Sequence, residues 1–336
     1  MEKHKTDLIV TRLTALWALS EAGLGGIMHA FKFPFTGIFL GSFAVICLTL
    51  LYFFTRNHHI LLQSLVVVLL VKLTVSPQSP LPAYLAVSLQ GGMAWMLFGF
   101  LKKIQISALL LGIWTLLSSA LQKIIVMTII FGNSIWKAFD EFGIFVLKIF
   151  ALQPAYQFSE VIIFAYLFLY LSVGFFTGIL AGKIPFQLQK ALNQNFDSLQ
   201  ITQDSTEIVA KTKKSAYQSW LWLLLLLSFV LIFSIAENKS LQALALLLRT
   251  LLILLVWYGL LAPWLLKMFQ KLLRKQSNRY ATHVTQTLDL LPQLRQITRL
   301  SWQQTATQKG WQRYRSFLFQ LLLYTLTFEN NPPEKS

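Results

Sequence analysis

Long apolar blocks alternate with short polar segments over most of the chain. A helix needs about 20 apolar residues to cross a bilayer. By this measure the pattern predicts eight membrane-spanning helices, at 8–29, 35–54, 60–76, 81–101, 105–131, 158–182, 217–235 and 241–265. The predicted fold is therefore all-α, a polytopic membrane bundle. The third span is short, and we expect Lys72 near its outer end to extend its ammonium group toward the membrane surface.

A polar segment at 183–216 divides the pattern into two parts. We expect a six-helix membrane module at 1–182, a cytoplasmic linker at 183–216, and at 217–336 a two-helix hairpin followed by cytoplasmic helices. In this last part Leu291, Leu294, Ile297 and Leu300 recur at three-residue intervals. That spacing predicts an amphipathic helix, and Pro292 is expected near its start because proline suits the first helical turn.

The segment at 132–157 also has an amphipathic pattern, with Trp136, Phe139, Phe142 and Val146 at near-helical spacing. It predicts a helix lying on the outer membrane surface, with Asp140 facing water. Such a helix serves either as a simple surface anchor or as a lid over an external binding site, and the pattern leaves both readings open.

Composition and charge indicate the class of protein and its orientation in the membrane. The chain is 55% hydrophobic and 12% charged, which excludes an ordinary soluble enzyme. It carries 29 Lys and Arg against 13 Asp and Glu, for a net charge of +16. In the eight-span arrangement most of the basic residues fall on one side, which places both termini in the cytoplasm by the positive-inside rule. We therefore expect a multi-pass protein of the cell membrane, with anionic lipid as one partner and no nucleic-acid partner.

Catalytic and metal-binding motifs do not stand out. The sequence has no Walker loop, HExxH motif or DDxxD motif, and His58 and His59 are adjacent instead of one helical turn apart. We expect a protein that is not an enzyme and that binds no cofactor or metal of its own.

Small residues shape the first two predicted helices. Ala18, Ala22 and Gly26 lie at four-residue intervals, a spacing that lets helix backbones approach closely in lipid. This stripe either packs inside the bundle or docks against another membrane subunit. The second helix begins with a P-x-x-G-x-x-x-G pattern formed by Pro34, Gly37 and Gly41.

These features resemble the substrate-binding S components of energy-coupling factor (ECF) transporters. The resemblance is carried by six predicted helices within 1–182, by Ala18 and Ala22, and by the P-x-x-G-x-x-x-G pattern. It implies a small-molecule substrate bound near the outer surface, beneath external loops. The candidate substrate-binding residues in that region are Trp114, Gln122, Lys123, Asn133, Trp136 and Glu160. Lys123 and Glu160 are expected at similar depth, as part of the pocket or as a structural ion pair.

The C-terminal part is similar to the coupling helices of the T component of the same transporters. There a Pro-led amphipathic helix runs into an Ala-Arg-Gly motif, and the matching positions here are Gln308, Lys309 and Gly310. The resemblance implies cytoplasmic ATPase subunits as partners, with ATP bound on them, contacted through Arg299, Gln308, Lys309 and Gly310. The sequence thus predicts a membrane subunit of an ECF-type uptake transporter. The alternative is a non-transporting multi-pass scaffold whose basic C-terminal tail binds lipid.

Overall fold

The computed structural model describes residues 2–30, 35–76, 79–101, 103–149, 157–193, 252 and 255–328. This part of the chain is helical and contains no strand. The first half holds α1 Glu2–Ala18, the π-helix η1 Leu19–Leu24, α2 Gly25–Ala30, α3 Thr36–Thr55, α4 His59–Val75, α5 Leu81–Phe100 and α6 Ile104–Phe131. The second half holds α7 Ser134–Ile149, α8 Phe158–Leu192, the π-helix η2 Leu255–Leu261, α11 Ala262–Gln304 and α12 Gly310–Thr327.

Four of the described helices are long and apolar enough to cross a membrane: α3, α5, α6 and α8. They coincide with four predicted spans, although α8 continues ten residues beyond the expected end at 182, into the predicted linker. The apolar helix α4 is shorter, at 17 residues. The first predicted span falls on the helical run of α1, η1 and α2. The span at 217–235, most of the span at 241–265 and most of the linker lie outside the described residues.

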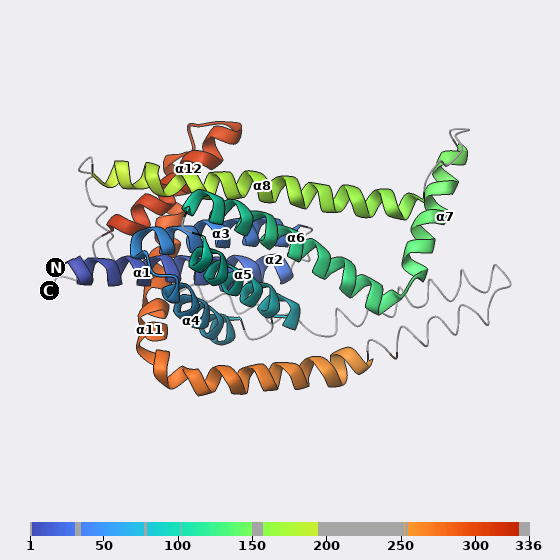
Figure 1. Cartoon of the computed structure of the whole chain (residues 1–336), viewed down its shortest axis with the longest axis horizontal. Helices are drawn as coiled ribbons and strands as arrows, with labels where there is room; N and C mark the ends of the chain where they lie inside the picture. The colour runs from blue at the N-terminus through green and yellow to red at the C-terminus, as the bar shows by residue number, and fades with distance from the viewer. Residues whose placement is uncertain are drawn as a thin grey trace.

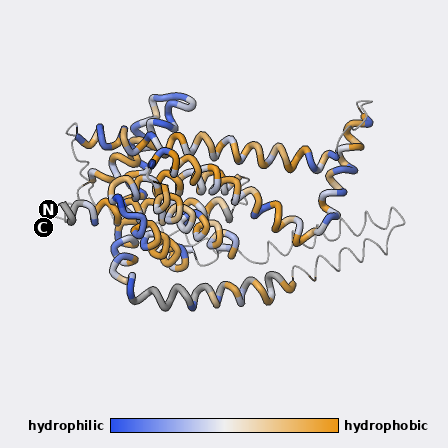
Figure 2. The backbone as a smooth tube through the Cα atoms, in the orientation of Figure 1, coloured by the Kyte–Doolittle hydropathy of each residue, from blue (hydrophilic) through white to orange (hydrophobic). Residues whose placement is uncertain are grey.

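The long helices run roughly side by side, and the polar elements lie at the two ends of the bundle (Figure 1). At one end α7 crosses the tips of α6 and α8. At the opposite end, near the N-terminus, the last part of α11 and the helix α12 lie against α1, α4 and α8. The hydropathy colouring follows the same division, because the helices between the two ends are mostly apolar (Figure 2).

Close packing of α6 on α8 forms the most extensive helix pair among the described elements. Gly174, Gly178 and Gly182 lie at four-residue intervals along α8 and face α6, where Gly174 and Gly178 meet Gly112 and Gly182 meets Gln105. A Cβ added to Gly112 would lie 2.5 Å from the carbonyl oxygen of Gly174 and 2.8 Å from the Cα of Gly178. The two backbones are therefore in direct contact, the arrangement that small residues at this spacing permit in lipid.

The C-terminal helices share one core with the N-terminal helices. Leu291, Leu294 and Ile297 of α11 and Leu322 of α12 are buried in the same apolar cluster as the side chains of α1, α3 and α4. The predicted apolar face of this segment is therefore covered by the chain itself. The expected helix start near Pro292 is wrong, because α11 begins at Ala262 and Pro292 lies inside it.

The helix α7 is tied to the start of α8. The Asp140 carboxylate accepts a hydrogen bond from the backbone N–H of Ser159, at 2.7 Å. Gly143 packs directly against the Phe158 ring. Asp140, expected only to face water, thus caps an orphan donor in the first turn of α8, where a negative charge is also favoured by the helix dipole.

Candidate functional site

A buried ion pair joins the first helical run to α4. The Lys72 ammonium donates a hydrogen bond to Glu21 Oε2 at 2.8 Å, and the two side chains are 1% and 2% exposed. No other ion pair between two described residues is present. Charged groups in the apolar interior of a membrane bundle are costly, so they are usually paired and mark functional positions.

The helix around Glu21 is irregular. Residues Leu19–Leu24 form a π-helix, and the backbone N–H of Gly25 bonds to the carbonyl of Ser20, five residues earlier. A π-turn widens a helix locally and often accompanies functional sites. It presents Glu21 to α4, where Lys72 Nζ also lies 5.8 Å from the centre of the Tyr84 ring. The second carboxylate oxygen, Glu21 Oε1, is buried and has no hydrogen-bond partner in the described part of the chain.

The expected outward extension of Lys72 is therefore wrong. Its ammonium group is almost fully buried because a carboxylate from a different helix neutralises it there. The sequence offered one signal, the presence of both charges within apolar blocks. It did not show how the first and third predicted spans are rotated and positioned relative to each other. A π-turn changes that alignment, and a pattern with the regular 3.6-residue period does not indicate such a turn.

The predicted outer residues lie on α6, in the turn between α6 and α7, on α7 and at the start of α8. Gln122 donates a hydrogen bond to the Pro82 carbonyl at 2.9 Å, and Trp136 Nε1 donates to Thr128 Oγ1 at 3.1 Å. Four of the six are exposed: Trp114, Asn133, Lys123 and Glu160. Among the described residues Lys123 and Glu160 form no ion pair, so the expected pairing is not present. The assignment of these residues to a solute site remains a prediction.

The small-residue stripe of the first helix packs within the chain. Ala18 and Ala22 are buried, and a Cβ on Gly26 would lie 3.2 Å from Ser76 Oγ. The surface that Ala18 and Ala22 would offer to another subunit is thus covered by the chain's own helices. Of the two readings of this stripe, the described contacts correspond to packing inside the bundle.

Arg12 fastens the last described helix to the first. Its guanidinium donates hydrogen bonds to the carbonyl of Leu326, at 2.7 Å, and to the carbonyl of Phe328. The guanidinium carbon also lies 4.0 Å from the centre of the Phe328 ring. These carbonyls belong to the end of α12, where backbone acceptors lack partners within the helix and a cation is favoured by the helix dipole. Arg12 lies within the first predicted span, and the sequence pattern gives no indication of this contact.

Replacing Arg12 with Met should release the end of α12 while keeping most of the side-chain volume. Hydrogen bonds to a charged group contribute about 1.5–3 kcal/mol each, so we expect a loss of stability of at least this size. Thermal unfolding of the purified chain, together with limited proteolysis near residue 328, measures the effect. Arg295→Met, at an exposed position of α11, is the matched control. Equal stability and equal proteolysis of the two variants would contradict the proposed role of Arg12 in holding the end of α12.

The turn between α11 and α12 forms an exposed basic tip. Arg299, Lys309 and Gly310 are exposed, Gln308 is half-buried, and Gly310 has a left-handed backbone with φ of 59°. A Cβ on Gly310 would meet no atom within 4 Å. Arg313 lies over the Trp302 ring, 4.0 Å from its centre. The hairpin therefore pairs a buried base with a charged, solvent-accessible end.

Exposed aromatic rings accompany these charges. Trp311 is 78% exposed and Tyr314 is 58% exposed, and Trp302 is also exposed. Tyr314 and Trp302 lie near each other, with ring centres 6.0 Å apart. Aromatic rings next to basic side chains suit both a protein partner and an anionic lipid surface.

No group of three or more His, Cys, Asp or Glu side chains in the described residues could hold a metal ion. Comparisons with protein-family models, curated proteins and solved structures each gave no match.

Proposed function

We propose that the chain is a multi-pass membrane subunit of an ECF-type uptake transporter. In this proposal cytoplasmic ATPases, which carry the ATP, act on the exposed tip of the α11–α12 hairpin. Solute enters at the opposite end, near Trp114, Gln122, Lys123, Asn133, Trp136 and Glu160.

The proposal is supported by the hairpin that α11 and α12 form, which is buried at its base and exposed at its tip. Its base is buried against α1 and α4, and Arg12 holds the end of α12 through the Leu326 and Phe328 carbonyls. Its tip exposes Arg299, Lys309 and Gly310, and Gln308, Lys309 and Gly310 stand at the positions of the Ala-Arg-Gly coupling motif of the T components, with Gln in place of Ala and Lys in place of Arg. A rigid element held to the membrane helices at one end and open to a partner at the other is suited to transmit movement.

The proposed topology has eight spans with both termini in the cytoplasm. It is supported by the excess of basic residues on one side and by the positions of α7 and the hairpin at opposite ends of the bundle. Single-cysteine labelling tests it cleanly, since the native Cys47 is buried and should not react. We expect a membrane-impermeant maleimide to label Lys137→Cys on intact cells and Lys309→Cys only after permeabilisation. Labelling of both on intact cells would contradict this orientation.

Recovery of an ATPase with the full-length chain in mild detergent tests the function. Because Lys309 is exposed at the hairpin tip, Lys309→Glu should lower recovery of the partner by about tenfold or more, by replacing an attractive charge with a repulsive one. Lys137→Glu makes the same charge change on α7, at the other end of the bundle, and should leave recovery unchanged. Absence of any ATPase with the wild-type chain, or equal recovery with both variants, would oppose the proposal.

The exposed Trp302, Trp311 and Tyr314 favour a second candidate, a non-transporting scaffold whose hairpin rests on anionic lipid. An environment-sensitive dye on Trp311→Cys distinguishes it in nanodiscs. A blue shift with anionic but not with zwitterionic lipid, together with no recovered ATPase, supports the scaffold. Unchanged emission opposes it.

A further inference from the structure

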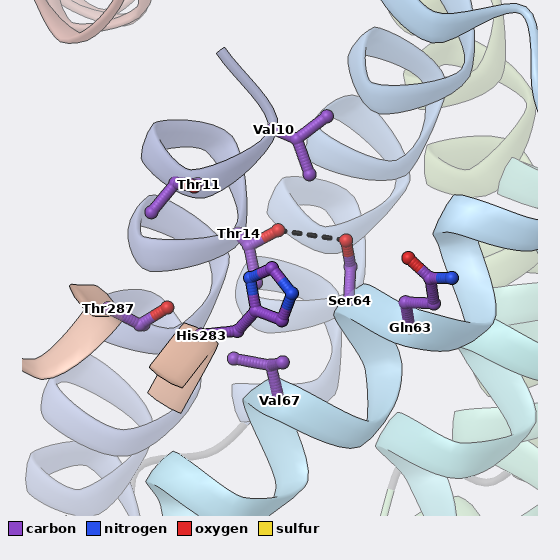
Figure 3. A pocket seen from close by; sticks show the side chains of 8 residues that line it. All are labelled: Val10, Thr11, Thr14, Gln63, Ser64, Val67, His283 and Thr287. Atoms are coloured by element: carbon purple, nitrogen blue, oxygen red, sulfur yellow. Dashed lines mark hydrogen bonds between the residues drawn. The ribbon is translucent and has the colours of Figure 1, made fainter. Parts of the chain in front are cut away.

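The first membrane helix changes from buried to exposed at its π-helix, Leu19–Leu24. Before this segment α1 is held in the bundle, where the Thr14 hydroxyl donates to Ser64 Oγ of α4 at 2.8 Å (Figure 3). At the end of the π-helix and beyond it, Leu24 and Ile27 are 49% and 58% exposed. The irregular turn therefore joins a closely packed part of the helix to an end with exposed apolar side chains.

The π-turn shifts every later residue of this helix by one position. Eleven residues make about three turns of a regular α-helix, so a regular helix would place Gly25 on the same face as Thr14. In the structure Gly26 takes that place, because a Cβ added to it would lie 3.2 Å from Ser76 Oγ at the end of α4. A Cβ on Gly25 would instead meet Leu40 Cδ1 of α3 at 3.0 Å. The contacts of the two glycines thus report the register of the helix.

Two buried polar groups lack partners in this register. The Trp17 Nε1–H donor and the Glu21 Oε1 acceptor form no hydrogen bond within the described residues, although their side chains are 0% and 2% exposed. They are four residues apart, and the π-turn begins between them at Leu19. Residues four apart in a regular helix are neighbours, so there the indole can donate to Oε1 while Oε2 keeps the Lys72 ammonium. A regular turn would therefore satisfy two groups that are costly to bury unpaired.

The contact with α3 opposes the regular turn. In the regular register Leu24 would stand where Gly25 now faces Leu40, at a distance that is tight for any side chain. The closest atoms that the two glycines face, Leu40 Cδ1 and Ser76 Oγ, are the ends of side chains. These ends can move aside while the helices stay packed, which backbone atoms cannot do. Each register thus leaves one requirement unmet, and the packing admits both.

We propose that residues 19–24 are a register switch, in which the helix exchanges the π-turn for a regular α-turn. The following helix α2 then turns by about 100°, the angle of one residue, while α1 stays fixed. Gly25 replaces Gly26 beside Ser76, and Leu24 moves from its exposed position toward α3. A group that donates to Glu21 Oε1 stabilises the π register, because it competes with the indole of α1. The switch is a property of this chain and does not depend on an ATPase partner.

Disulfide cross-linking of paired cysteines in the full-length chain measures the two registers. Gly26→Cys with Ser76→Cys reports the π register, because a Cβ on Gly26 lies 3.9 Å from Ser76 Cβ, within the range of a disulfide. Gly25→Cys with Ser76→Cys reports the regular register. We expect both pairs to cross-link, whereas Ile27→Cys with Ser76→Cys, the control at an exposed position, should not. The native Cys47 is buried and should not compete.

Trp17→Phe tests the cause of the exchange. It removes the indole N–H that the regular turn satisfies through Glu21 Oε1. The share of the Gly25–Ser76 cross-link should therefore fall by about tenfold, the effect of one hydrogen bond to a charged group. Trp95→Phe is the matched control, because the Trp95 indole N–H is also buried without a partner in the described chain but lies on α5. It should leave the share unchanged.

Three results would overturn the switch. A Gly25–Ser76 cross-link no stronger than that of the Ile27 control would show a single register. Equal cross-linking of all three pairs would show a frayed helix end instead of a shift by one residue. An unchanged share in Trp17→Phe would show that the indole does not favour the regular turn.

Magnetic resonance of the chain with isotope-labelled tryptophan checks the switch without cysteine variants. We expect the Trp17 indole N–H to give two signals, or one broadened by exchange, identified by their loss in Trp17→Phe. A single sharp signal would contradict the switch. Thermal unfolding of each variant verifies that a lost cross-link does not reflect lost folding.

Discussion

Lys72→Met should lower the free energy of unfolding by about 3–5 kcal/mol, the usual cost of leaving one charge of a buried ion pair without its partner. The variant keeps the length and apolar volume of the side chain but removes the ammonium that holds Glu21 Oε2 at 2.8 Å. Glu21 is 2% exposed and its other oxygen already lacks a partner, so no protein group is in place to compensate. Denaturant titration of the purified chain in detergent micelles measures the change.

The matching double variant, Glu21→Gln with Lys72→Met, should recover most of the lost stability. It removes both charges together, and replacing a complete buried pair is often neutral or stabilising. Glu21→Gln alone should also be destabilising, because it leaves the Lys72 ammonium buried without its carboxylate. If Lys72→Met and the double variant are equally stable, the carboxylate is not held in its charged form by Lys72, and our description of the pair is wrong.

The contrast between this pair and the predicted outer site shows what the sequence can and cannot specify. Apolar block length located both ends of α3, α5 and α6 and the start of α8 to within one residue, because crossing a bilayer imposes a length and a composition on each helix separately. Which charges meet depends on the rotation and depth of two helices together. Lys72 and Glu21 meet through a π-turn, while Lys123 and Glu160, expected at similar depth, do not pair.

The C-terminal region shows the same difference between what local sequence patterns indicate and what long-range packing decides. The three-residue spacing of Leu291, Leu294 and Ile297 correctly indicated which face of the helix is apolar, since all three are buried. The sequence left open what covers that face, and lipid and a partner were the candidates. The chain's own α1 and α4 cover it, a choice fixed by long-range packing. Arg12 adds to this packing across 314 positions of sequence separation, a contact that local patterns do not encode.

The second large effect concerns the contact of α6 with α8, where Gly178→Ala should be strongly destabilising. A Cβ at Gly178 would lie 2.6 Å from the Cα of Leu109 and 2.8 Å from its carbonyl oxygen. Both neighbours are backbone atoms, so no side-chain rotation relieves the overlap, and the helices must separate. Overpacking a tight site costs about 1–3 kcal/mol, and we expect the upper end of that range or more.

Gly92→Ala provides the matched control, because a Cβ there meets nothing within 4 Å. It lies inside α5, where alanine is favoured over glycine by up to about 1 kcal/mol, so this variant should unfold at the wild-type temperature or slightly above it. Thermal unfolding of both variants in the same detergent makes the comparison. Gly112→Ala should resemble Gly178→Ala, since its Cβ would meet the Gly174 carbonyl oxygen at 2.5 Å from the other side of the same contact. If all three alanine variants unfold alike, α6 and α8 do not touch through their backbones, and the four-residue glycine spacing of α8 needs another explanation.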